Sequence, residues 1–145
     1  MSYEVLYSFI VKGHLMSTLL MTGLIYVIQW VHYPLFKYVG ANSMTLYHTS
    51  HVNRITWLVA PLMLFELISG MILYIYCMNP AHEVHYFWAL LCTVIIWLST
   101  AFLQVPAHNK LSQGFDVQHY NFLVNSNWVR TIMWSIRSGI VISIC

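Results

Sequence analysis

Five histidines lie at or just outside the ends of long apolar segments; they are His32, His48, His51, His108 and His119. Neutral imidazole is the commonest nitrogen ligand for zinc, copper and iron in proteins. Few carboxylates accompany these histidines, and such a set suits those metals better than magnesium or calcium. The residue types therefore indicate a site for iron, copper or zinc, or for haem b, provided that the chain brings these segment ends together.

The spacing of the histidines favours such a cluster. His48 and His51 are three residues apart, so on a helix both project from one face about one turn apart. An H-x-x-H pair alone is a weak motif, and a histidine at a membrane interface can also be a solvated side chain without a metal. We predict that the metal ligands are His32, His48, His51 and His108, and we leave open whether His119 joins them.

The elements that would position these side chains are four apolar stretches, approximately Val5–Val31, Ile55–Cys77, Tyr86–Val105 and Asn121–Ile144. Each approaches the roughly 20 residues needed to cross a bilayer core. The 145 residues are 59% hydrophobic and 7% charged, whereas a soluble domain carries about a quarter charged residues. We predict one all-α domain over residues 1–145, a four-transmembrane-helix bundle integral to the membrane. In a chain that crosses the membrane four times, the ends of the first and third spans lie on the same side as the starts of the second and fourth spans. These four segment ends are therefore neighbours.

Charges suggest an orientation for this bundle. The side that carries the histidines holds Lys37, Arg54, Lys110 and Arg130 against Asp116, so the positive-inside rule places it in the cytoplasm and both termini outside.

We expect a bacterial inner membrane, with the lipid bilayer and a hydrophobic small molecule as partners and a homodimer as an option. The basic residues form no stripe, so nucleic acid is not expected as a partner. The cysteines form no C-x-x-C pair, which argues against a thiol–disulfide relay.

Three local features refine the helix ends. Ser43 is a suitable N-cap, which would make Met44–Arg54 a helical extension of the second span. Pro61 should kink that helix. The third span should end near Pro106, with residues 107–118 forming a loop or a short interfacial turn.

A second polar group is expected near the membrane midplane. Glu66 falls close to the middle of the second span, where an ionisable side chain is costly unless it is paired. At about 1.5 Å per residue, Glu66 lies about 16 Å in from the histidine side, Arg137 about 22 Å and His14 about 25 Å. Arg137 is long enough to reach Glu66, and His14 would join them if the helices are adjacent. His48 lies about 27 Å from Glu66 along the axis. Two separate sites follow, with His14 as a candidate axial ligand of a haem. The alternative is a buried Glu–Arg pair that only fixes helix packing.

The stretch Val105-Pro106-Ala107-His108-Asn109-Lys110-Leu111, followed by Asn127-Trp128-Val129-Arg130-Thr131, resembles the anthrone-oxygenase-like family of small four-helix membrane proteins. Those proteins typically show a Val-Pro-x-Asn-x-x-Leu turn and then Asn-x-x-Arg-Thr at the head of the last helix. The likeness covers about the last third of the chain. His108 stands where that family usually has asparagine.

The first half is similar in layout to the HemJ-type protoporphyrinogen oxidases, on Lys12-Gly13-His14-Leu15, Gly23-Leu24-Ile25-Tyr26 and the stretch from Tyr47 to Pro61-Leu62-Met63. Those four-helix proteins carry haem on a histidine of the first helix, which corresponds to His14. The lysine usually found early in their third helix is absent, and Phe87-Trp88-Ala89 occupies that region.

These observations favour a membrane-embedded oxidoreductase that uses a histidine-bound metal or haem on a small hydrophobic, aromatic substrate. We assign catalytic roles to Glu66, Arg54 and Arg130, and cofactor-binding roles to His14, Arg137 and Asn127. Glu66 would transfer protons, whereas Arg54, Arg130 and Asn127 would position an anionic group or support a metal ligand. The alternatives are a dimeric proton-coupled transporter centred on Glu66, a HemJ-like oxidase, and a structural subunit of a respiratory complex.

Overall fold

The computed structural model describes residues 2–144, apart from the side chain of Ala41, and within that range the chain forms helices and no strand. The first helical segment comprises α1 (Tyr3–Val27), the π-helical turn η1 (Ile28–His32), α2 (Tyr33–Leu35) and the 3-10 turn η2 (Phe36–Tyr38). The second is α3 (Ala41–Ile75). The third comprises α4 (Pro80–Ser99), a second π-helical turn η3 (Thr100–Gln104) and α5 (Val105–Leu111), and the fourth is α6 (Val117–Ile142). The all-α prediction is confirmed.

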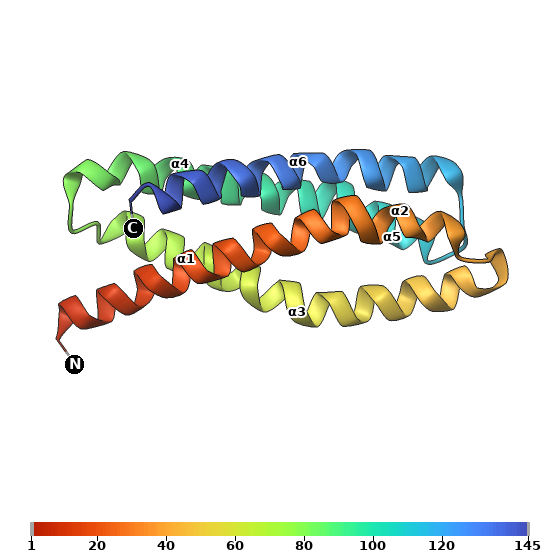
Figure 1. Cartoon of the computed structure of the whole chain (residues 1–145), viewed down its shortest axis with the longest axis horizontal. Coiled ribbons are helices and arrows are strands. Elements are labelled where there is room, and N and C mark those ends of the chain that lie inside the picture. The colour runs from red at the N-terminus through yellow and green to blue at the C-terminus, as the bar shows by residue number, and fades with distance from the viewer. Residues whose placement is uncertain (1, 145) are drawn as a thin grey trace.

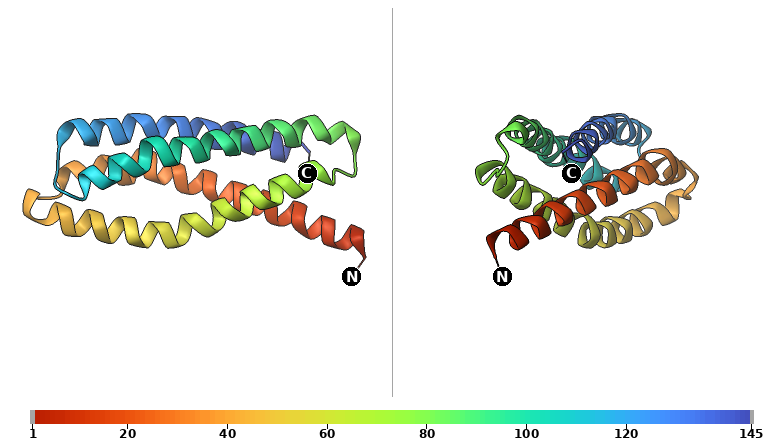
Figure 2. Two further views of the ribbon diagram at one scale, coloured as in Figure 1. Left: turned by 180° about the vertical axis from the view of Figure 1, so that it is seen from behind. Right: turned by 60° about the vertical axis from the view of Figure 1, so that its left-hand side comes forward.

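The four segments run alternately up and down (Figure 1). Each long helix packs against its neighbour along the chain, and α6 closes the bundle by packing against both α1 and α4. Both termini lie at the end of the bundle that holds the α3–α4 connection (Figures 1 and 2). The opposite end gathers α2, α5 and the starts of α3 and α6, and we call it the histidine end.

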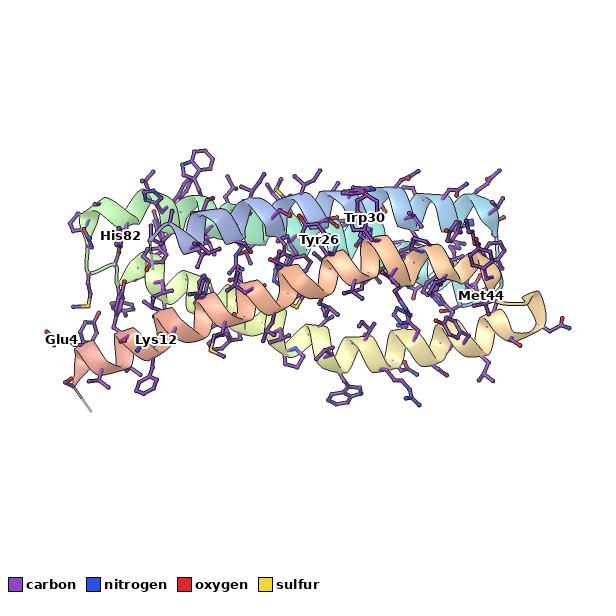
Figure 3. The ribbon with its side chains drawn as sticks, viewed as in Figure 1. Glu4, Lys12, Tyr26, Trp30, Met44 and His82 are labelled. Atoms are coloured by element: carbon purple, nitrogen blue, oxygen red, sulfur yellow. The ribbon has the colours of Figure 1, made fainter. Side chains whose placement is uncertain are left out.

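Side chains mark the two ends of the bundle in Figure 3. Glu4, Lys12 and His82 lie at the end that holds the termini, whereas Met44 lies at the histidine end. Met44 is fully buried, so the start of α3 packs into the core although its sequence is more polar than the rest of that helix. The histidine end is therefore a folded part of the bundle and not a loose set of connections.

Three segments, Tyr3–Tyr38, Asn42–Ile75 and Pro80–Leu111, are long and apolar enough to cross a membrane. Large apolar side chains also point outward from them, as at Trp57, which is 84% exposed, and Phe102, which is 72% exposed. Such a surface is compatible with a lipid bilayer. The remaining helix, α6, is more polar, since it carries Arg130 and Arg137 together with several asparagines.

Two predicted helix ends are wrong. The N-cap of α3 is Gly40 instead of Ser43, although the predicted helical extension Met44–Arg54 is present. The third segment stays helical as far as Leu111, so only residues 112–116 of the predicted loop are outside a helix. Pro61 lies inside α3, which bends along its length (Figure 2).

The two π-helical turns explain why Pro34 and Pro106 do not end their helices. Proline lacks a backbone N–H, and in a regular helix its ring collides with the carbonyl four residues earlier. In both cases the residue before the proline donates its N–H to the carbonyl five residues earlier. The wider turn accommodates one extra residue. Each turn also buries a glutamine, Gln29 in η1 and Gln104 in η3.

Candidate functional site

The four predicted metal ligands meet at the histidine end. His32 comes from η1, His48 and His51 from the part of α3 near its start, and His108 from α5. The Nε2 atom of His32 lies 2.8 Å from Nδ1 of His51, and Nδ1 of His108 lies 3.0 Å from Nε2 of His48. The two pairs are adjacent, because the ring centroids of His51 and His108 are 6.1 Å apart and those of His48 and His51 are 6.3 Å apart. The structure therefore brings together side chains that are far apart in the sequence.

A directed hydrogen-bond chain runs through one of these pairs. The Ser112 hydroxyl donates to the carbonyl of His108, so its oxygen accepts from Nδ1 of His48 at 2.9 Å. With both imidazoles neutral, His48 accepts at Nε2 from Nδ1 of His108. His108 then accepts at Nε2 from the hydroxyl of Tyr33 at 3.0 Å. Ser112 thus determines the tautomers of both histidines.

A pocket of about 230 Å³ adjoins the cluster. Its walls come from α3, the end of α4, η3, α5 and neighbouring parts of the first and last segments. Its apolar side includes Ile28, Val59, Met63 and Trp97, and its polar side includes Tyr33, His51, His108, Gln104 and Arg130. An apolar cavity with a few convergent polar groups is the usual form of a small-molecule site.

Arg130 is the charged group of this pocket and is only 6% exposed. It donates to Asn127 Oδ1 at 3.2 Å and to the hydroxyl oxygen of Tyr33, and its guanidinium carbon lies 5.2 Å from the centre of the Trp134 ring. Asn127 is itself held by its side-chain amide, which donates to Gln29 Oε1 at 2.9 Å. Asn127 therefore positions Arg130 and is not among the residues that line the pocket.

Arg54 and His119 lie outside this arrangement. Arg54 is exposed on α3 and borders a shallow outer groove with His32 and His51, so the structure separates it from Arg130 and from the pocket. His119 is also apart from the cluster, because its Nδ1 lies 2.8 Å from Oδ1 of Asp116, the N-cap of α6. Hydrogen bonds from the backbone N–H and the ring of His119 hold the pKa of Asp116 below its usual value.

The second predicted group, His14, Glu66 and Arg137, also comes together, deep in the bundle. Arg137 forms a buried ion pair with Glu66, and its guanidinium lies 3.1 Å from Nε2 of His14. Trp134 donates its indole N–H to Glu66 Oε2 at 3.1 Å. Because its ring also faces Arg130, Trp134 lies between this group and the pocket.

Both ring nitrogens of His14 already have protein partners. Ser69 donates its hydroxyl to the carbonyl of Phe65, so it accepts from Nδ1 of His14 at 2.6 Å, while Arg137 donates to Nε2. His14 is 1% exposed. A haem iron on this histidine would have to displace one of these two contacts.

Sequence reasoning missed Tyr33 and Ser112, and it noted Gln104 only as a residue four positions before His108, without a role in the site. Tyr33 follows His32 directly, and Ser112 lies four residues after His108, so both were within one helical turn of a predicted ligand. Gln104 shares a signal with Gln29, since each is a polar residue in an apolar run shortly before a proline.

Within residues 2–144, no group of three or more histidine, cysteine or acidic side chains is arranged to hold a metal ion. The facing nitrogens of each histidine pair instead contact one another directly. Comparison of the chain with family models, curated proteins and solved structures gave no significant match.

Proposed function

We propose that this chain is an integral membrane oxidoreductase of four spans in which the histidine cluster holds a transition metal beside a substrate pocket. The observation that supports the proposal is the convergence of His32, His48, His51 and His108, from three separate elements, at the edge of that pocket. The substrate would be small, hydrophobic and aromatic, and it would enter from the bilayer. The resemblance of the last third of the chain to anthrone-oxygenase-like proteins favours the same class of reaction.

The donor set suits iron, copper or zinc in type, and within each pair it is close to the required spacing. Two nitrogens on one tetrahedral metal, each about 2.0–2.1 Å from it, stand roughly 3.3 Å apart. The facing nitrogens are 2.8 and 3.0 Å apart, so each pair would have to separate by only a few tenths of an ångström. Ser112 directs the lone pair of His48 Nε2 toward the cluster, which is the usual role of an outer-shell partner.

The protein residues would orient the substrate and exclude water, while the metal would supply the redox chemistry when bound. Tyr33 and Arg130 face the pocket from its polar side, and the apolar side keeps it dry. With a metal on the facing nitrogens of His48 and His108, the proton of His108 would be on Nε2, which would donate to the hydroxyl oxygen of Tyr33. This contact would hold the Tyr33 hydroxyl at the polar side of the pocket.

Metal titration of the protein purified in mild detergent tests the proposal. We expect about one Co²⁺ per chain, detected by its visible absorption and by elemental analysis, and loss of this binding when His48 and His51 are both replaced by alanine. The His119→Ala variant is the matched control, because that histidine is at the same end but outside the cluster, and it should bind Co²⁺ normally. Binding that is absent in the wild type, or unchanged in the double variant, would contradict the proposal. A Soret band in the purified protein would instead indicate haem b.

A further inference from the structure

The two arginines of α6 differ in how their charges are compensated. Arg130 and Arg137 are seven residues apart, so they lie on one face of the helix about two turns from each other. Arg137 pairs with Glu66. Arg130 is also buried, but its hydrogen-bond partners Asn127 and Tyr33 are neutral, and among residues 2–144 no carboxylate forms an ion pair with it. A buried charge without a counter-charge is strongly unfavourable, so this position favours a bound anion.

Unsatisfied polar atoms point to the same pocket. In the described part of the chain, six buried side-chain nitrogen or oxygen atoms have no hydrogen-bond partner. Three of these atoms belong to pocket-lining residues: Nε of Arg130, Oε1 of Gln104 and Nε1 of Trp97. Buried polar atoms are rarely left unpaired, so three of them beside one cavity indicate ligand contacts.

We infer that the pocket binds a hydrophobic organic monoanion that also carries a hydroxyl group. The ionised oxygen would accept from Arg130 Nε, the hydroxyl would donate to Gln104 Oε1, and the ring or chain would lie against Val59, Met63 and Trp97. Charge-assisted hydrogen bonds of this type are about twice as strong as neutral ones, so the anionic group provides most of the selectivity. This inference rests on the proposed function for the location of the site but requires no metal.

The test is isothermal titration calorimetry on the whole protein in a non-ionic detergent with EDTA present. The probes are 6-hydroxy-2-naphthoate, whose hydroxyl is too far from the carboxylate to bond to it, 2-naphthoate, which lacks the hydroxyl, and methyl 2-naphthoate, which also lacks the charge. We expect the wild type to bind 2-naphthoate about tenfold more tightly than the methyl ester. The hydroxyl should add a further gain, and that gain should be lost in Gln104→Leu.

Arg130→Gln should bind the acid and the ester equally, with ester affinity close to that of the wild type, which also shows that the variant is folded. Arg130→Lys, which keeps the charge, covers the case in which the glutamine variant does not fold, and it should retain part of the preference for the acid. Lys110→Gln, an exposed basic residue at the same end, should bind all probes as the wild type does.

Equal affinity of the wild type for acid and ester, or an unchanged preference in Arg130→Gln, would overturn the inference. Because EDTA is present, failure of this binding leaves the metal proposal standing. Failure of Co²⁺ binding would equally leave the anion site standing.

Discussion

Replacing Glu66 with glutamine should destabilise the bundle by about 3 kcal/mol. Glu66 and Arg137 have side chains only 2% and 1% exposed, so water compensates neither charge. At an effective dielectric of about 20 and a charge separation of about 4 Å, their attraction is about 4 kcal/mol. Glutamine keeps one oxygen, which can accept from Arg137 or from the indole N–H of Trp134 but leaves its NH2 facing the other donor, so only part of the hydrogen bonding survives. Removing one partner of a buried pair typically costs about 3–5 kcal/mol, and the glutamine variant should lie at the lower end.

The assay is reversible unfolding in mixed micelles with increasing sodium dodecyl sulfate, followed by circular dichroism. A cycle with Glu66→Gln, Arg137→Gln and the double variant isolates the pair, and the double variant should be about 2 kcal/mol more stable than additivity predicts. Glu83→Gln is the control, because Glu83 is exposed in the first turn of α4, at the end of the bundle that holds the termini, and it should change stability by less than about 0.5 kcal/mol. A Glu66→Gln variant as stable as the wild type, or strict additivity, would refute the reasoning.

Three further predictions concern α6 and the histidine end. Hydrogen bonds from His119 lower the pKa of Asp116, so the ionised carboxylate stabilises the start of α6. This stabilisation is complete above the ordinary pKa of an aspartate and is lost as the pH falls through the lowered pKa. Asp116→Asn should therefore reduce the pH dependence of the melting temperature measured between roughly pH 2 and 5. Ser112→Ala should weaken Co²⁺ binding about 10- to 100-fold in the titration, because His48 loses its outer-shell partner, and unchanged affinity would show that His48 does not bind through Nε2. Trp134→Phe removes a hydrogen bond to the buried carboxylate and should cost about 1–3 kcal/mol in the unfolding assay, whereas no loss would mean that a neighbouring group replaces that donor.

The helices could be predicted because apolar runs of bilayer length are unambiguous in sequence. The ends of the helices differ from the predictions where the local backbone conformation sets the cap residue. The N-cap of α3, for example, is Gly40 in place of Ser43. The continuation past Pro106 could not be foreseen from propensity, since proline normally ends a helix. It depends on η3, whose extra residue is visible only in the backbone hydrogen bonds.

The meeting of the histidines could be predicted for a different reason. Short connections force antiparallel neighbours, so the topology alone places His32, His48 and His108 at one end of the bundle. Which side chains face one another depends on helix rotation, and rotation depends on packing that one sequence does not reveal. For that reason the sequence predicts the same role, the positioning of an anionic group, for Arg54 and Arg130. In the structure, Arg130 is buried and Arg54 is exposed.

The π-helical turn η1 absorbs one residue of chain length without rotating the helix that follows it. Its N–H to C=O bond spans five residues, from Tyr33 back to Ile28, and covers about the rotation that four residues cover in an α-helix. Deleting one residue from residues 28–31 would therefore close the turn to regular α-helix and leave His32 directed nearly as before. A residue lost from the regular part of α1 has no such compensation and would rotate the residues beyond it by about 100°. Proteins of this architecture could thus lack the turn and still share the site.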